Sequence, residues 1–413
     1  MTAVSNTTGR LSSPPSASAS GRGVLAVACG AHALHDGLTD LLYVLFPIWQ
    51  AAFGLDYAAV GALRALAAGT MASMQVPAAT LGKRVGGVLV LTVGTGIVGL
   101  AYVLAGASAG LHSLALALVL GGIGLSTQHP IASSLVARAY DGSRSRAALG
   151  TYNFAGDIGK VIVPATTASL IAWITWRPAV SVVGAVALAA AVVIALALNT
   201  LRKRAGEAVP PPDAAEPGQA LADSEAAPAG AQRGFRVLLA IGVVDSATRM
   251  GFLTFLPFLL KMKGAELPTL GVALALVFAG GAAGKLVCGF LGARLGVLRT
   301  VYLTEGLTAA SILALLPLPL GVSLALLPLL GVALNGTSSV LYGTVPELVA
   351  AHRRETAFGI FYTGTIGGGA LSPIAYGWLG DMVGVHPMMA VLAVICLATI
   401  PLAIMLRPAL ATR

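Results

Sequence analysis

The chain has 413 residues, of which 57% are hydrophobic and only 10% are charged. Soluble domains carry about 25% charged residues, so a water-soluble fold is excluded and the lipid bilayer must solvate most of the chain. The formal net charge of +9 does not indicate a nucleic-acid-binding protein, because the basic residues lie in short groups between apolar segments.

The sequence predicts an all-α membrane protein with twelve transmembrane helices. Residues 1–22 are rich in Ser, Ala and Thr and predict a disordered tail. The segment that follows is too long for a cleavable signal peptide, and it carries two acidic residues. Apolar stretches long enough to span a bilayer, at about 20 residues each, begin near Val24, Ala58, Val88, Leu111, Ala147, Pro178, Phe235, Thr269, Thr300, Gly321, Thr356 and Pro387.

A change of composition divides these helices six and six. Residues 202–234 contain a run of three prolines and scattered acids without apolar periodicity, which predicts a cytoplasmic linker. We therefore expect an N-terminal six-helix bundle at residues 23–201 and a C-terminal six-helix bundle at residues 235–407. Residues 1–22 and 408–413 are expected to be cytoplasmic tails.

The distribution of basic residues predicts the orientation. With both termini in the cytoplasm, 18 of the 25 Lys and Arg residues fall in cytoplasmic segments, 3 fall in outer loops and 4 lie inside helices. Because cytoplasmic loops carry the excess of positive charge, we expect a multi-pass protein of the inner (plasma) membrane with both termini inside.

The two halves also repeat in sequence. Pro47, Asp56 and the segment 81–86 are followed 210 residues later by Pro257, Glu266 and the segment 291–296. Gly150, Gly159 and Pro164 are matched at an offset of 209 by Gly359, Gly368 and Pro373. Two six-helix halves in the same orientation are then related by an axis along the membrane normal.

Two parallel six-helix repeats, a long central linker and a Gly-Lys-Arg-Val-Gly turn at residues 82–86 resemble the major facilitator superfamily. That family's turn motif, Gly-x-x-x-Asp-Arg-x-Gly-Arg-Arg, is only partly kept. Lys83 stands where the motif has Asp, Arg84 and Gly86 match it, and Gly87 replaces the next Arg. The resemblance implies a secondary transporter that works by alternating access.

Within this superfamily the first helix resembles the fosmidomycin-resistance-like branch of efflux proteins. The residues that carry this resemblance are His32, His35-Asp36, Pro47, Gln75-Val76-Pro77 and His129-Pro130. Helix 5 has Gly156, Gly159 and Pro164 but lacks the Gly-Pro ending of many antiporters of the family. The resemblance therefore hints at efflux by antiport.

Eight ionisable side chains stand out inside the predicted spans, four acids and four bases: Asp36, Asp40, Arg64, Asp157, Lys160, Asp245, Arg249 and Lys285. Charges at this depth are costly and are usually functional. On helix 1 His32, Asp36, Asp40 and Tyr43 share one face. This stripe favours proton coupling at Asp36 or Asp40, with Asp157 and Asp245 as further coupling candidates. The alternative is that the acids are fixed polar contacts between helices.

The predicted substrate-binding residues are the polar and aromatic side chains expected to line the cavity between the halves. They are His32, Tyr43, Arg64, Gln75, His129, Asn153, Lys160, Arg249, Lys285, Asn335, Tyr342 and Tyr362. Local pairing of Asp157 with Lys160, and of Asp245 with Arg249, is the alternative to a transport role for these groups. The repeat places Asp40 and Arg249 at equivalent positions, so we expect Asp40 to pair with Arg249 or Arg64 and to close the outer path.

These observations favour a proton-coupled transporter that exports a small anionic or amphiphilic organic compound by H⁺ antiport. The alternatives are uptake of an organic anion by H⁺ symport and a non-transporting sensor or assembly factor on a transporter fold. No nucleophile or phosphate-binding loop indicates an enzyme, and no cofactor is expected. The three cysteines lack metal-ligand spacing, and no metal site is predicted. The expected partners are protons, a small-molecule substrate and lipid, and the protein is expected to be a monomer.

Overall fold

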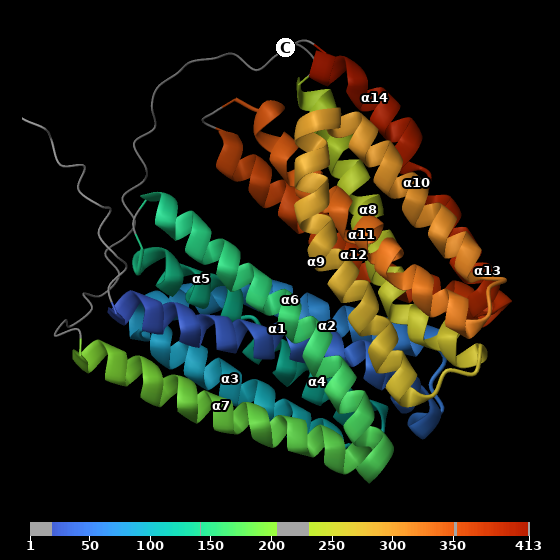
Figure 1. Ribbon diagram of the computed structural model, residues 1–413. Helices are drawn as coiled ribbons and strands as arrows, with labels where there is room; N and C mark the ends of the chain where they lie inside the picture. Colours follow the sequence, from blue (N-terminus) through green and yellow to red (C-terminus); the bar gives the residue numbers. More distant parts are fainter. Residues whose placement is uncertain (1–18, 141, 205–230, 351–352, 412–413) are drawn as a thin grey trace, which may run out of the picture.

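The computed structural model describes residues 19–411 except 141, 205–230 and 351–352. This part of the chain is built from helices (Figure 1). They are α1 (Ala19–Phe53), α2 (Tyr57–Val85), α3 (Gly87–Gly106), α4 (Leu111–Leu125), α5 (Gln128–Arg138), α6 (Gly142–Ile174), α7 (Trp176–Arg204), α8 (Ala231–Met262), α9 (Leu267–Leu295), α10 (Val297–Leu315), α11 (Leu320–Thr344), the short 3₁₀ helix η1 (Val345–Glu347), α12 (Arg354–Val383), α13 (Val385–Cys396) and α14 (Thr399–Ala411).

These helices make twelve membrane crossings, as predicted. Helices α4 and α5 together form one apolar span, Leu111–Arg138, and α13 and α14 form another, Val385–Leu410. After each break, the third residue of the following helix is a proline, Pro130 in α5 and Pro401 in α14. Proline has no N–H to donate and its ring clashes with the carbonyl four residues earlier, so it interrupts the helix. Eight of the twelve crossings are apolar enough to span a membrane by length and composition alone.

The helix boundaries extend the predicted ones at both ends of the bundles. Helix α1 begins at Ala19, inside the segment expected to be a tail, and α14 continues to Ala411. Helix α7 runs to Arg204 and α8 begins at Ala231, so the ends of the predicted linker are helical. Residues 1–18, 205–230 and 412–413, where the remaining tail and linker predictions fall, lie outside the described residues.

The turns between helices repeat in backbone conformation as well as in sequence. Gly54 and Gly264 both have positive φ, as do Gly86 and Gly296, and each pair is 210 residues apart. Thr175, with φ of 67°, is the only described non-glycine residue with positive φ. Its partner at an offset of 209 is Gly384, with φ of 88°. The left-handed conformation is thus a property of the repeated turn, which Thr175 adopts despite its side chain.

The two bundles are held together by a repeated crossing of helices. In one crossing a Cβ on Gly61 of α2 would lie 2.1 Å from the carbonyl oxygen of Pro373 on α12. In the equivalent crossing a Cβ on Gly271 of α9 would lie 3.3 Å from the carbonyl oxygen of Pro164 on α6. Glycine lets the helix backbones approach closely. The carboxylate of Asp381 also accepts hydrogen bonds from the first two N–H groups of α2, at 2.7 and 2.8 Å.

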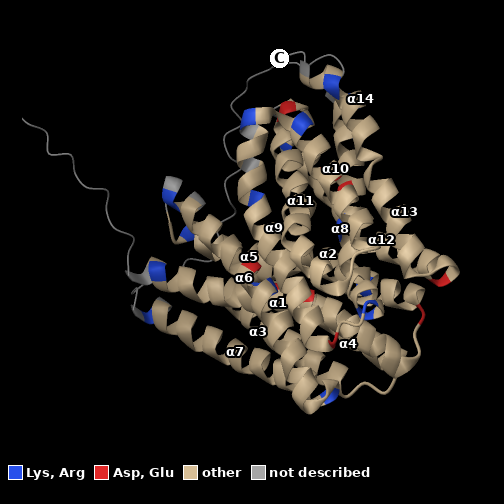
Figure 2. Cartoon of the chain, turned by 45° about the vertical axis from the view of Figure 1, so that its right-hand side comes forward, with Lys and Arg blue, Asp and Glu red and all other residues tan. Residues whose placement is uncertain are grey.

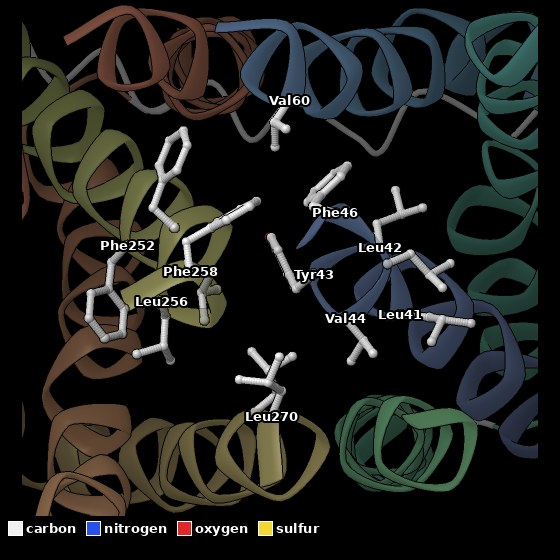
Figure 3. Packing of buried hydrophobic residues seen from close by; sticks show 14 of the residues in the cluster. Leu41, Leu42, Tyr43, Val44, Phe46, Val60, Phe252, Leu256, Phe258 and Leu270 are labelled. Carbon is white, nitrogen blue, oxygen red and sulfur yellow. The ribbon is translucent and has the colours of Figure 1, made fainter. Parts of the chain in front are cut away.

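The hydrophobic core shows that apolar packing joins the bundles at one end. One large cluster unites side chains of both halves, including Tyr43, Phe46, Phe252 and Leu270, around the junction of α1, α2, α8 and α9 (Figure 3). A second cluster, which includes Leu91 and Tyr152, belongs to the N-terminal half, and a third, which includes Phe361, belongs to the C-terminal half. The bundles therefore diverge toward the side where α1 begins and α14 ends, called here the terminus side (Figure 1). The closed end is called the far side.

The surface of the bundles is that of a membrane protein. Large apolar side chains such as Trp173, Leu116 and Leu371 are mostly exposed. Charged residues are sparse along the helices, and Lys and Arg gather at helix ends (Figure 2). An apolar exterior of this kind is solvated by lipid.

Replacing Gly61 with Ala is expected to weaken the far-side closure. The new methyl group must displace the Pro373 carbonyl, at an expected cost of roughly 1–3 kcal/mol, so far-side opening becomes more populated. Spin labels on Ala109 and Val322, exposed residues near the far-side ends of α4 and α11, measure the separation of the halves by pulsed electron paramagnetic resonance. Gly69→Ala on the same helix is the matched control, because its Cβ would meet nothing within 4 Å. Unchanged distances in the Gly61 variant would contradict the role of this contact.

Candidate functional site

The predicted acidic stripe of α1 is bound by a lysine of α6. The Lys160 ammonium lies 3.3 Å from Asp36 Oδ2 and 3.8 Å from Asp40 Oδ2. Two histidines approach the other oxygen of Asp36, with His32 Nε2 at 3.4 Å and His129 Nε2 at 3.7 Å. We call these five residues, His32, Asp36, Asp40, His129 and Lys160, the Asp36 cluster. Both carboxylates are buried, at 9% and 8% exposure, and so need these partners.

Two glycines of α6 make this arrangement possible. A Cβ on Gly159 would lie 1.8 Å from the carbonyl oxygen of Ala33, and one on Gly156 would lie 2.7 Å from Asp36 Oδ2. The backbones of α1 and α6 therefore approach more closely than larger residues would allow. This close approach brings Lys160 to the acids of α1.

The ring of His32 is fixed in place by Tyr152 of α6. The two rings stack with centroids 4.0 Å apart and an angle of 16° between their planes. His32 Nδ1 lies 2.8 Å from the backbone carbonyl oxygen of Tyr152. A carbonyl oxygen only accepts, so Nδ1 carries the hydrogen, and a neutral ring then has its free lone pair on Nε2. That atom is buried, faces Asp36 and has no hydrogen-bond partner.

A second ion pair crosses between the bundles. Lys285 of α9 donates to both carboxylate oxygens of Asp157 on α6, at 2.6 and 2.8 Å. The local Asp157–Lys160 pair that the sequence offered as an alternative is thus replaced by two separate partnerships. Lys160 binds the acids of α1 within its own bundle, and Asp157 binds the other bundle.

Arg64 lies at the far-side junction but does not bind an acid there. Its guanidinium donates to the hydroxyl of Tyr43, at 3.0 Å from Nη2 and 3.3 Å from Nε. Nη2 also lies 3.4 Å from the sulfur of Met250 on α8. Among the described residues no ion pair within 4.0 Å joins Asp40 to Arg64 or Arg249. The expected far-side charge pair is therefore not formed in this conformation, and a Tyr–Arg–Met contact takes its place.

The C-terminal bundle holds an acidic pair that the sequence analysis missed in part. Glu305 of α10 is only 2% exposed, and its Oε2 lies 3.0 Å from the Cys396 thiol. Its carboxyl group lies beside that of Asp245 of α8, which is 5% exposed. No Lys, Arg or His lies within 4.0 Å of either carboxyl group in the described chain. Glu305 therefore joins Asp36, Asp40, Asp157 and Asp245 as a fifth acid that lies away from the helix ends.

The repeat could have revealed Glu305. Asp245 and Glu305 lie 210 residues after His35 and Thr95, and the N-terminal pair is itself hydrogen-bonded, at 2.8 Å. The same two positions of each bundle thus hold one buried polar contact. Glu305 is also an acidic residue inside an apolar span, which is a signal in its own right.

The other predicted lining residues make no hydrogen bond to the Asp36 cluster in the described chain. Tyr342 and Tyr362 stack on each other with centroids 4.6 Å apart. Asn335 donates to the Gly331 carbonyl of its own helix at 3.3 Å. Gln75 is half-buried and Asn153 is exposed. No hydrogen bond between these residues and the cluster is found in the part of the chain that the structure describes, so they remain predicted lining residues.

The geometry is that of a two-bundle transporter with buried charges between and within its halves. The family model of the Major Facilitator Superfamily matches residues 28–325 and again residues 237–413. The chain belongs to this superfamily and is a secondary transporter rather than an enzyme. No curated protein matches the sequence. The fosmidomycin-resistance-like branch is not confirmed by these comparisons.

Solved transporters share the fold at low sequence identity. A bacterial homolog of the human lysosomal transporter Spinster, in an inward-facing and occupied conformation, has a TM-score of 0.77 and 17% identity over 94% of this chain and 96% of that chain. Its inward-facing, unoccupied form has the same TM-score and identity over 95% and 98%. A mutant of the nucleoside transporter NupG has a TM-score of 0.71 and 13% identity over 94% and 99%.

The Asp157–Lys285 pair is expected to show energetic coupling between the bundles. Asp157→Asn or Lys285→Gln alone leaves one charge without its partner and should lower stability by about 1–3 kcal/mol. The double variant should lose less than the sum of the two, because no unpaired charge remains. Unfolding of the purified variants measures this double-mutant cycle. In the control cycle, Lys261→Gln at an exposed far-side position takes the place of Lys285→Gln. Its effect on stability should add to that of Asp157→Asn. Additivity in both cycles would show that the ion pair has no energetic role.

Proposed function

We propose that this chain is a proton-coupled transporter of a small organic anion that works by alternating access between its two bundles. The observation that carries the proposal is the sharing of two lysines among three acids. Lys160 is held by Asp36 and Asp40, while Asp157, one turn before Lys160, is held by Lys285 of the other bundle. The three acids and two lysines are therefore able to exchange partners.

The charge of the Asp36 cluster supports a proton-binding role. With both histidines neutral, its two carboxylates and one ammonium carry a net charge of −1. An uncompensated buried charge is costly, and one proton neutralises the cluster. The free lone pair of His32 and the carboxylate of Asp36 face each other at 3.4 Å and can share that proton. Loading and release of the proton thus change the charge of a buried site.

Exchange of partners links the proton to an anionic cargo. An anion that binds Lys285 frees Asp157, which then competes for Lys160 three residues further along α6. Asp36 and Asp40 lose their cation in this exchange, and a proton replaces it. Anion and proton therefore bind together, which is the requirement for symport. The sequence alone favoured antiport, but for an anionic cargo the ion-pair arrangement favours the symport alternative.

Antiport is the second candidate and applies to a cationic or amphiphilic cargo. A cation would compete with the proton for Asp36, Asp40 and Asp157, so the two would bind in alternation. A sensor or assembly factor without transport is less well supported, because such a protein does not need exchangeable buried charges. The sequence-based orientation adds that both termini are cytoplasmic, so that the terminus side is the inward-facing side. The proposal also includes location in the inner membrane and function as a monomer.

Asp36→Asn is expected to abolish anion accumulation driven by a pH gradient while preserving exchange of labelled anion. The amide cannot take up and release the coupling proton, but it leaves a polar group in place. Proteoliposomes with a trapped pH indicator and a panel of organic anions and cations measure both fluxes. Asp56→Asn, which changes an acid at the far-side start of α2, should behave as wild type.

The direction of proton movement decides between the candidates. If protons move in the same direction as an anion, the result supports symport. If protons move in the opposite direction to a cation, antiport takes the place of symport in the proposal. A wild-type protein that moves neither under any gradient would end the transport proposal. Normal pH-driven accumulation by the Asp36→Asn variant would show that this acid is structural.

Lys285→Ala is expected to weaken binding of an anionic cargo and to make the remaining affinity less dependent on salt, because a charge–charge attraction is lost. The measurement is binding of the best anion from the flux panel at low and physiological ionic strength. Lys261→Ala, a change of an exposed lysine at the far side, is the matched control. Tighter binding of a cation than of any anion by wild type would reverse the predicted sign of the cargo.

A further inference from the structure

We propose that His32, Asp36 and His129 form a binding site for a divalent transition-metal ion such as Zn²⁺ or Co²⁺. One donor atom from each residue lies within 4.8 Å of the other two. His32 and Asp36 are one turn apart on α1, and His129 is in the first turn of α5, so two helices supply the ligands. A set of two imidazoles and one carboxylate suits zinc and its neighbours rather than Mg²⁺ or Ca²⁺, which prefer oxygen ligands alone.

His32 has the features of a metal ligand rather than of a merely buried histidine. Its Nδ1–H is held by the Tyr152 carbonyl oxygen at 2.8 Å, and stacking on the Tyr152 ring fixes its plane. Histidines that bind metals are usually oriented by such a second contact through the other nitrogen. The remaining Nε2 is buried, lacks a hydrogen-bond partner and faces the carboxylate of Asp36. A neutral His32 therefore presents a free lone pair to a group that cannot donate to it.

His129 supplies the accessible side of the site. Its side chain is 45% exposed, whereas that of His32 is 3% exposed. The two imidazole rings meet edge to face, with centroids 5.2 Å apart. The Nε2 atoms of His32 and His129 lie 3.4 and 3.7 Å from the same oxygen of Asp36. Ligand atoms about 2.0–2.2 Å from a tetrahedral zinc ion lie roughly 3.3–3.6 Å apart, so the two histidine–aspartate distances already fit this spacing. The two imidazole nitrogens lie within 4.8 Å of each other and can reach it by a turn of the exposed His129 side chain. The exposed side leaves room for water or a cargo group as the fourth ligand.

The charges of the site accept a cation. Asp36 and Asp40 outweigh Lys160 by one negative charge when both histidines are neutral. The ammonium of Lys160 contacts Oδ2 of Asp36, whereas the histidines approach Oδ1. The carboxylate can therefore bind the metal with one oxygen and keep Lys160 on the other. Asp40, at 3.8 Å from Lys160, supplies a second partner for the ammonium.

Metal binding by these three side chains does not depend on the proposed function. A bound ion would occupy the Asp36 carboxylate that the proposed function uses, so if both hold, Zn²⁺ is expected to inhibit proton-driven flux.

The test is a titration of the purified full-length protein, freed of any histidine tag, with Co²⁺ followed by visible absorption. We expect saturable binding with the ligand-field bands of histidine-bound Co²⁺, and displacement by Zn²⁺. His32→Gln, Asp36→Asn and His129→Gln should each weaken binding by about tenfold or more. His112→Gln and His386→Gln change two histidines outside the site and should leave binding unchanged. Because His129 is exposed, its substitution is the one least able to disturb folding, and a melting curve of each variant checks this.

The outcomes separate the metal site from the proposed function. Absence of saturable Co²⁺ or Zn²⁺ binding by wild type, or binding that survives all three substitutions, overturns the metal site. In that case proton-driven flux that still depends on Asp36 leaves the proposed function standing. Metal binding that is lost in the variants supports the site even if no pH gradient drives transport, and the proposed function alone then fails.

Discussion

A buried carboxylate in a membrane protein must find a counter-charge on another helix, and the contact between Asp36 and Lys160 meets this requirement for the centre of the molecule. The side chains are 3.3 Å apart and come from α1 and α6. Their contact depends on the glycines of α6, since a single methyl group at Gly159 would overlap the backbone of α1. The need to neutralise a charge thus determines how closely two helices must pack, and the packing in turn determines which other polar groups can reach the site.

The same requirement is met differently in the two halves. The N-terminal bundle surrounds its acids with Lys160, His32 and His129, whose nitrogen atoms lie 3.3–3.8 Å from the carboxylate oxygens. The C-terminal bundle places Asp245 beside Glu305 with no basic side chain within ion-pair distance in its described part. Two carboxyl groups in contact cannot both be ionised at low cost. The two bundles therefore repeat in structure but accommodate their buried acidic groups in different ways.

Closure at the far side is mainly apolar, whereas the central site is ionic. Tyr43, Phe252 and Leu270 belong to one core that unites the bundles, and Gly61 and Gly271 let the crossing helices touch. Apolar contacts of this kind have no strong directional preference, so they can separate and re-form as the bundles move. The Asp157–Lys285 ion pair, in contrast, is specific in distance and partner and crosses between the bundles next to the Asp36 cluster. The bundles are thus joined by apolar contacts at the far side and by an ion pair near the centre.

The sequence by itself determined the twelve crossings, the repeat and the polar face of the first helix. Hydropathy and a period of 3.6 residues are local properties, so His32, Asp36 and Asp40 could be placed on one face without knowledge of the fold. The repeat offset likewise predicted the equivalent turns at Gly86 and Gly296.

Only the tertiary structure decided which charges are partners. Local spacing offered Asp157 with Lys160, but the approach of α1 takes Lys160 away and Lys285 of the other bundle replaces it. His129 reaches Asp36 from almost a hundred residues along the chain, and no spacing in the sequence indicates that contact. The physical reason is that the distances between helices decide which acid a long basic side chain can reach. These distances depend on packing between segments that are remote in sequence.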